Sequence, residues 1–142
     1  MQEDLFPRQG KAVARAIRDL FIHDLGGVVS MHMLAEQAIA RGVFPDNMLA
    51  GFSKAGAAAW CRKALKQKDE TGLPLAKPLT SGDGAVWKQW LLMTYEEAAA
   101  AIERDASSVV ADYRELRVLY NDCKQRFGRA PEIPELREIE FA

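Results

Sequence analysis

Glycine and proline divide this sequence into segments that no single helix or strand can bridge. Gly42 and the pair Gly26 and Gly27 each follow an amphipathic helical pattern, and Gly72-Leu73-Pro74 ends a third pattern. Gly128 closes a fourth. Glycine destabilises helix interiors and proline cannot donate the helical hydrogen bond, so these positions mark the ends of elements. We therefore expect three helices before residue 72 and one after it.

Apolar periodicity predicts the first two helices. The first begins near Arg8, and its apolar residues recur at three- and four-residue steps on one face: Val13, Ile17, Leu20 and Phe21. The second begins after Ser30, whose hydroxyl can accept from a free N–H of the first turn, and it ends at Gly42. The connection VFPDNMLAGF carries turn residues, and we expect one loose turn over residues 47–51.

The third helix is the most informative segment, because its two faces differ in chemistry. Ser53 is its predicted N-cap, and the pattern runs through KAGAAAWCRKALKQK. At 100° per residue, the side predicted to face the core holds Ala57, Trp60, Cys61 and Ala64. The other side is small and basic, with Lys54 at its edge: Ala55, Ala58, Ala59, Arg62, Lys63 and Lys66.

A β-hairpin is predicted directly after the third helix. LAKPLT can be extended, with Pro74 and Pro78 at edge positions, SGDG supplies turn residues, and AVWKQWLLM is rich in β-favouring side chains. A phosphate-binding loop is excluded here, because no helix with Lys-Ser/Thr follows SGDG. Since side chains alternate along a strand, Trp87 and Trp90 should lie on opposite faces, and one of them should pack on the last helix or on another subunit.

The last helical pattern covers residues 94–128. Thr94 and Glu97 form a capping box at its start, and about 30 helical residues would span about 45–50 Å. Its apolar seam is close to a heptad, which is typical of a coiled coil, and the predicted homodimer contacts are Ile102, Val109, Tyr113, Leu116 and Tyr120. Folding back onto the preceding domain is the alternative. Residues 129–142, acidic with two prolines, are expected to form a flexible tail.

Length and composition bound the remaining possibilities. A chain of 142 residues with 49% hydrophobic content suits one domain with an appendage. No run of about 18 apolar residues occurs, and the start MQEDLFPRQG lacks the order of a secretion signal, so we expect a cytoplasmic protein that does not bind membranes. The net charge of −1 conceals a basic front and an acidic back: residues 1–80 hold 11 Lys/Arg and 8 Asp/Glu, and residues 81–142 hold 8 and 12.

No catalytic or metal-binding pattern is present in the sequence. His23 and His32 lie on different predicted helices without another ligand at metal-site spacing, and we expect no cofactor. Cys61 and Cys123 are far apart and are expected to be buried or half-buried free thiols. Without a nucleophile motif or a paired acid and base, the chain is not expected to be an enzyme.

The order of elements suggests a function that no short motif provides. Three helices, the third of them small and basic on its outer face, precede a two-stranded hairpin that carries Lys77 and Lys88. In this order, residues 8–93 resemble a winged helix-turn-helix DNA-binding domain. More loosely, RKALKQKDETGLPLA, the glycine-containing turn and WKQW are similar to small regulators of actinobacteria and their phages.

The expected fold class is mainly α with a small β-hairpin. It comprises a winged-helix domain over residues 8–93, a long dimerising helix over residues 94–128 and the tail. The resemblance implies a sequence-specific regulator of transcription, or a phage-type accessory factor, that binds double-stranded DNA as a homodimer. It places Ser53, Lys54, Arg62, Lys63 and Lys66 at the DNA, with Lys77 and Lys88 flanking them. The alternative function is a protein-interaction module that keeps the winged-helix shape and binds its partner through Trp87 and Trp90.

Overall fold

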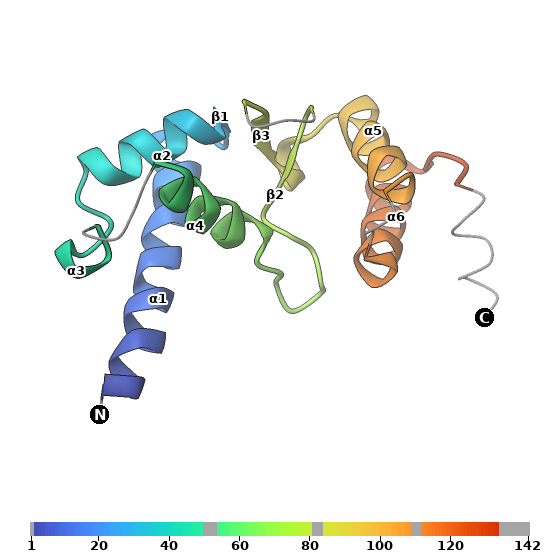
Figure 1. Cartoon of the computed structure of the whole chain (residues 1–142). Helices are drawn as coiled ribbons and strands as arrows, with labels where there is room; N and C mark the ends of the chain where they lie inside the picture. Colours follow the sequence, from blue (N-terminus) through green and yellow to red (C-terminus); the bar gives the residue numbers. More distant parts are fainter. Residues whose placement is uncertain (1, 50–53, 81–83, 109–111, 134–142) are drawn as a thin grey trace.

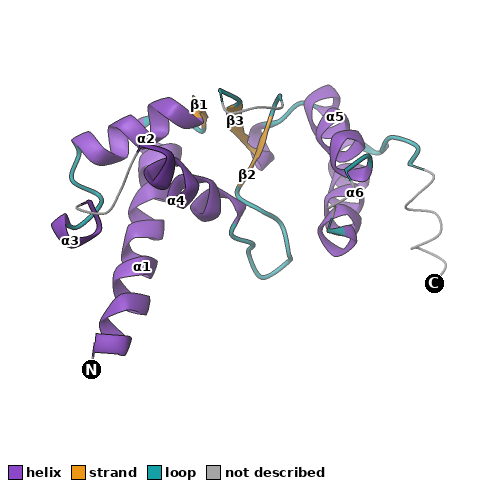
Figure 2. Cartoon of the chain, in the orientation of Figure 1, coloured by secondary structure: helices purple, strands orange, loops and turns teal. Residues whose placement is uncertain are grey.

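The computed structural model describes residues 2–49, 54–80, 84–108 and 112–133, apart from the side chains of residues 2–9, 49 and 54. The chain forms a helical body, a small sheet and a C-terminal helical hairpin (Figure 1). In the view of Figure 2 the strands lie between the helices of the body and those of the hairpin. The fold is therefore mainly helical with one small antiparallel sheet, as expected.

Four α-helices build the body, and Gly26–Gly27 and Gly42 follow the first two helical segments as the sequence predicts. The helices are α1 (Gln2–Asp19), α2 (Met31–Ala40), α3 (Asp46–Leu49) and α4 (Lys54–Lys66). One π-helical turn, η1 (Leu20–Asp24), extends α1, and Gly26 and Gly27 then take positive φ angles of 73° and 76°. Ser30 caps α2 by accepting a 3.2 Å hydrogen bond from the Met33 N–H. The predicted loose turn is α3.

The sheet has three strands, one more than the sequence predicts. The expected hairpin is β2 (Ala76–Pro78) and β3 (Val86–Gln89), and β1 (Val28–Ser30) pairs antiparallel with the other edge of β3. The strand order is β1-β3-β2, so Pro78 lies on an edge strand, where its missing N–H is tolerated. With only three residues between the Gly26–Gly27 turn and α2, β1 is too short for an alternating pattern to show.

The helical body and one face of the sheet share a single core. The predicted apolar side of α1 is confirmed, because Val13, Ile17, Leu20 and Phe21 are all buried. They pack in the same cluster as the buried sides of α2 and α4 and with Trp87 of β3. This cluster fixes which face of α4 points outward.

The predicted single helix over residues 94–128 is wrong. Two helices, α5 (Tyr95–Ala106) and α6 (Tyr113–Phe127), form an antiparallel hairpin, and the predicted capping box of Thr94 and Glu97 does start the first of them. The break follows from capping: the Asp112 carboxylate accepts from the N–H groups of Arg114 and Glu115 and starts α6 anew.

The predicted dimer seam is used within the chain instead. Ile102 and Leu116 are buried in a second core between α5 and α6, and Tyr120 packs against this core. Tyr113 is exposed, and Val109 lies outside the described residues. Because Ile102 and Leu116 already contact residues of their own hairpin, they cannot also form a coiled-coil seam with a second copy while the hairpin is closed.

The start of the predicted flexible tail is ordered against the same second core. Ile133 is buried there, Ala130 packs against it, and the Cys123 thiol donates to the carbonyl of Arg129 at 3.5 Å. The tail expectation is therefore wrong for residues 129–133, because the apolar Ile133 gains by leaving water. Residues 134–142 lie outside the described part of the chain.

Candidate nucleic-acid interface

Helix α4 presents a narrower basic face than its sequence pattern predicts. Ala57, Cys61 and Ala64 are buried as expected, but Ala58 and Leu65 are buried with them. The buried arc is wider because α2 and α1 both pack on α4. The remaining exposed or half-buried positions are Ala55, Gly56, Ala59, Trp60, Arg62, Lys63 and Lys66.

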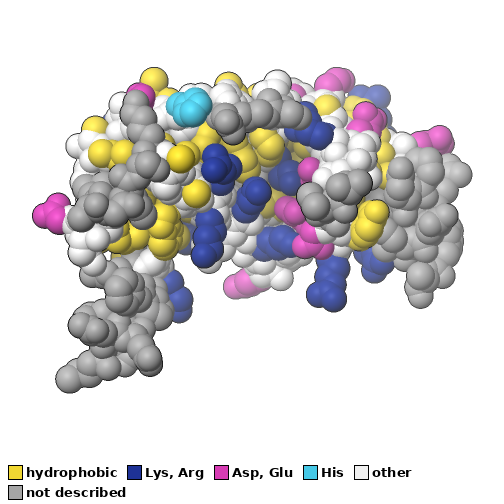
Figure 3. All heavy atoms as spheres, viewed as in Figure 1, with side chains coloured by type: hydrophobic (Ala, Val, Ile, Leu, Met, Phe, Trp, Pro, Cys, Tyr) yellow, Lys and Arg dark blue, Asp and Glu magenta, His cyan; other side chains and the backbone are white. Residues whose placement is uncertain are grey.

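Three cations of this face keep their charge free for a partner. Lys63 and Lys66 are exposed and Arg62 is half-buried. Among the described residues, no carboxylate lies within ion-pair distance of any of the three. In Figure 3, Lys and Arg side chains gather over α4 in the middle of the face shown. The predicted contacts Arg62, Lys63 and Lys66 are thus brought together on one accessible helix.

Two predicted contacts at the start of this helix cannot be placed. Ser53 lies outside the described residues, and of Lys54 only the backbone is described. The helix itself begins at Lys54, directly after the expected N-cap position.

The two lysines of the sheet are not available to DNA, which corrects the prediction for both. The Lys77 side chain is buried, and its Nζ lies 2.6 Å from an oxygen of Asp105 and 3.8 Å from one of Glu115. The Nζ of Lys88 lies 2.7 Å from Glu97. All three acids belong to the C-terminal hairpin, which folds against the sheet and neutralises both lysines.

Backbone contacts reinforce this attachment of the hairpin to the sheet. The guanidinium of Arg104 on α5 donates to the carbonyl oxygens of Pro78 and Leu79, each at 2.7 Å. At the other end, Arg126 on α6 donates to the carbonyl oxygen of Leu91 at 2.9 Å. The hairpin thus binds both the strand β2 and the turn that follows β3.

Neither tryptophan of the expected hairpin is a surface for a protein partner. Trp87 is 4% exposed in the first core and Trp90 is fully buried in the second. The indole N–H of Trp90 donates to a carboxylate oxygen of Asp122 on α6 at 2.7 Å. The expectation that one tryptophan packs on the last helical segment is confirmed, and the proposed partner surface of Trp87 and Trp90 is wrong because both rings are enclosed.

A groove lined by residues of α1 and α4 was not predicted from the sequence. Its volume is about 760 Å³, and both helices contribute basic side chains to it. The cations of α1 are Lys11, Arg15 and Arg18; those of α4 are Lys63 and Lys66. The periodicity of α1 predicts that these three residues lie opposite its buried face, but only the packing of α1 on α4 places them beside the lysines of α4.

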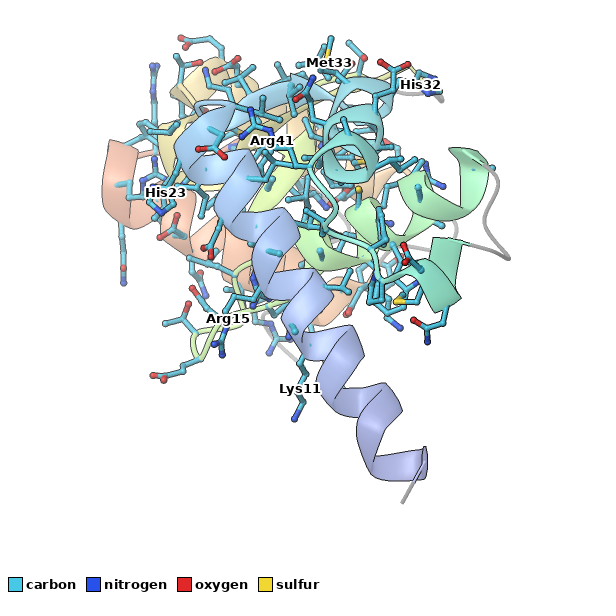
Figure 4. The ribbon with its side chains drawn as sticks, turned by 90° about the vertical axis from the view of Figure 1, so that its left-hand side faces the viewer. Lys11, Arg15, His23, His32, Met33 and Arg41 are labelled. Carbon is cyan, nitrogen blue, oxygen red and sulfur yellow. The ribbon has the colours of Figure 1, made fainter. Side chains whose placement is uncertain are left out.

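The remaining titratable candidates show no site. His23 and His32 are both exposed and point to different sides of the molecule (Figure 4). Cys61 and Cys123 are buried free thiols, as predicted, and burial raises the pKa of Cys61 to about 12. Within the described residues, no three His, Cys, Asp or Glu side chains are grouped as metal ligands.

Among the helices that the structure describes, none combines the length and apolarity needed to cross a bilayer.

Comparison with protein-family models, with curated proteins and with solved structures gave no match for this chain. The comparisons therefore add no relative on which a function could be based.

Proposed function

We propose that this protein binds double-stranded DNA through the exposed face of α4 and acts as a sequence-specific regulator or a phage-type accessory factor. The observation that carries the proposal is the distribution of free positive charge. Lys77 and Lys88 are neutralised by the C-terminal hairpin, whereas Arg62, Lys63 and Lys66 face solvent without a carboxylate partner among the described residues. Free cations on one helix are what binding to phosphates requires.

The arrangement of the body supports the same proposal. The order of the three longer helices α1, α2 and α4 and of a three-stranded antiparallel sheet, with β1 between α1 and α2, is consistent with the winged-helix resemblance. The exposed positions Ala55 and Ala59 are small, which allows the backbone of α4 to approach a DNA groove closely. Arg62 can donate two hydrogen bonds to one guanine, the commonest base-specific contact.

The mode of binding that we propose does not use the β2–β3 hairpin, which would be the wing of a winged-helix domain. The β2–β3 hairpin is held by Arg104 and its Lys77 is buried, so the sheet presents no free cation to the duplex within residues 76–80 and 84–89. Recognition is therefore assigned to α4, with the acidic C-terminal hairpin attached on the side of the sheet.

Binding to a fluorescently labelled 20-base-pair duplex, measured by anisotropy between 50 and 200 mM salt, tests the proposal. We expect the affinity to fall steeply with salt, since each neutralised phosphate contributes about −0.9 to the slope of log K against log salt. Lys63→Glu should reduce the affinity at least tenfold, because it replaces an attraction with a repulsion. Lys124→Glu changes the net charge equally on α6 and should leave binding unchanged.

A protein-interaction function is the second candidate, and one observation favours it. Leu91 and Leu92, in the 3₁₀ turn η2 (Trp90–Leu92), are 60% and 51% exposed, an apolar pair of the kind that partners cover. Absence of duplex binding at 50 mM salt, with Lys63→Glu indistinguishable from the wild type, would refute the DNA proposal and favour this alternative.

A further inference from the structure

Within the described residues, the groove between α1 and α4 has an apolar floor, and the charged side chains on its rim are all cations. Its floor is formed by Ala14, Ala64 and the half-buried indole of Trp60. The rim holds the five cations named above, and among the side chains that the structure describes no carboxylate lines the groove. A groove with this lining favours a ligand that has several negative charges for the rim and a less polar part for the floor.

Trp60 is held at the base of this groove by its neighbours. A Cβ placed on Gly10 of α1 would lie 3.4 Å from Cη2 of the indole, which is van der Waals contact, so the ring lies directly beside α1 at this position. The Nζ of Lys63 lies 5.6 Å from the ring centroid, within the range of a cation–π contact. The ring thus lies between α1 and Lys63, and its exposed part is available to a ligand.

The α1 cations form a row along one side of the groove. Lys11, Arg15 and Arg18 are spaced by four and three residues, and Figure 4 shows Lys11 and Arg15 projecting from the same side of α1. Seven residues of helix extend about 10 Å. One strand of B-form DNA carries a phosphate per about 3.4 Å of helix axis, so the row has the length of about three phosphate-to-phosphate steps.

One contact holds the end of this row. The guanidinium of Arg18 donates to the side-chain oxygen of Gln67, which follows the last residue of α4. Gln67 is neutral, so this bond joins the two helices without cancelling the charge of Arg18. A carboxylate in the place of Gln67 would have neutralised Arg18, whereas the neutral amide leaves its positive charge in the groove.

We propose that this groove binds the sugar–phosphate backbone of one strand of the duplex, an inference that rests on the proposed function. Lys11 and Arg15 contact phosphates from the α1 side, Lys63 and Lys66 contact them from the α4 side, and Trp60 packs against a deoxyribose. Because Lys63 and Lys66 belong both to the exposed face of α4 and to the groove, a duplex lying on α4 continues into the groove. The supporting contacts beside α4 then come from α1 and not from the wing.

The test compares two double variants of equal charge in the anisotropy assay described above. Lys11→Gln/Arg15→Gln removes two exposed cations of α1 that line the groove, and Arg114→Gln/Lys124→Gln removes two exposed cations of α6. We expect the α1 double variant to reduce the magnitude of the salt slope by about 1.8, since each lost phosphate contact removes about 0.9. The reduction should be the same for unrelated duplex sequences, because phosphates carry no sequence information. The α6 double variant should behave as the wild type.

Acrylamide quenching provides a second readout that is independent of charge. Of the three tryptophans, Trp87 and Trp90 are buried and Trp60 is half-buried, so quenching of the native protein reports mainly on Trp60. Saturating duplex should reduce the quenching constant of the wild type at least twofold. Trp60→Phe should remove most of the quenching in the absence of DNA.

Four outcomes would overturn the inference. If the wild type binds DNA with a salt slope that the α1 double variant leaves unchanged, the groove is not a backbone site although the proposed function survives. The same conclusion follows if duplex leaves Trp60 as accessible as before. If a polyglutamate peptide of matched charge protects Trp60 and loses its binding in the α1 double variant while duplex does neither, the groove binds an acidic protein. If no duplex binds at all, the proposed function fails first.

Discussion

The ammonium of Lys77 lies 2.6 Å from the carboxylate of Asp105, so a lysine in the middle of β2 is bonded to a different helical unit of the chain. An oxygen of the Glu115 carboxylate lies 3.8 Å from the same ammonium. Lys77 is thus placed between α5 and α6, and it links the sheet to both helices of the C-terminal hairpin.

Replacement of Lys77 should destabilise the whole protein. Lys77→Met leaves two partly buried carboxylates without their cation, which we expect to cost about 2–3 kcal/mol of unfolding free energy. The melting temperature should fall by about 5–10 °C in a circular-dichroism melt. Lys63→Met, at an exposed position without an ion pair among the described residues, should change stability by less than about 0.5 kcal/mol. Equal melting temperatures for the two variants would show that the Lys77 ion pairs contribute little.

The bond between Trp90 and Asp122 should contribute measurably to holding the hairpin in place. Trp90→Phe removes the indole donor and leaves a gap in a fully buried position, and together these should cost about 2–4 kcal/mol. Urea denaturation followed by circular dichroism measures this difference. Trp60→Phe is the matched control, because Trp60 is only half-buried, and it should cost less than about 1 kcal/mol. A Trp90→Phe variant as stable as the control would contradict the prediction.

Gly26 and Gly27 should respond differently to the same substitution. Both have φ near +75°, a left-handed conformation that alanine disfavours, so alanine at either position should lower the free energy of unfolding by about 1–2 kcal/mol. A Cβ at Gly26 would meet nothing within 4 Å, whereas one at Gly27 would lie 2.8 Å from Oε1 of Gln89 and 3.0 Å from Cδ1 of Leu92. Gly27→Ala should therefore lower the free energy of unfolding by about 1–2 kcal/mol more than Gly26→Ala does. Its urea midpoint should be correspondingly lower. Equal midpoints would mean that both side chains move aside without cost.

Stability should decline in acid because carboxylates at the junction are stabilised in their charged form. The hydrogen bond from Lys88, followed by that from the Thr94 N–H, lowers the pKa of Glu97, and the hydrogen bond from Lys68 lowers the pKa of Asp112. A lowered folded-state pKa contributes stability that is present above the unfolded-state pKa and is lost as the pH falls through the folded-state value.

The measurement is a series of thermal melts between pH 7 and pH 2.5. The melting temperature should begin to fall below about pH 4.3, which is the ordinary side-chain pKa of glutamate in an unfolded chain. Lys88→Met should make this fall shallower, because Glu97 then loses the first cause of its lowered pKa. Lys124→Met, which leaves Glu97 and Asp112 untouched, should retain the steepness of the wild type. A Lys88→Met profile parallel to that of the wild type would contradict the assignment to Glu97.

The local signals in the sequence predicted most helix ends and the first core correctly. Gly42 and Gly128 end their helices with φ near +70°, and the capping bonds of Ser30 and Thr94 form as expected. These features depend on residues within four positions of one another, so the printed order of residues is sufficient to predict them. The same holds for the buried side of α1, whose apolar spacing is a property of one helix.

Features that join distant segments were decided only by the tertiary structure. β1 exists because Val28 and Ser30 find β3 almost 60 positions later, and a three-residue strand carries no pattern of its own. The apolar seam over residues 94–128 is equally compatible with a coiled coil between two copies and with a hairpin that buries Ile102 against α6, and the second arrangement is the one formed.

Some features of the candidate site likewise follow from the sequence alone, and others depend on the tertiary structure. The sequence by itself determined that Arg62, Lys63 and Lys66 lie on one side of a helix, because helical periodicity fixes their directions relative to one another. It could not determine which lysines stay free. Charge is cancelled by whichever acid the fold brings within about 4 Å, and that distance depends on the packing of the whole chain. Tertiary packing therefore paired Lys77 and Lys88 with the acidic hairpin and set the cations of α1 beside those of α4.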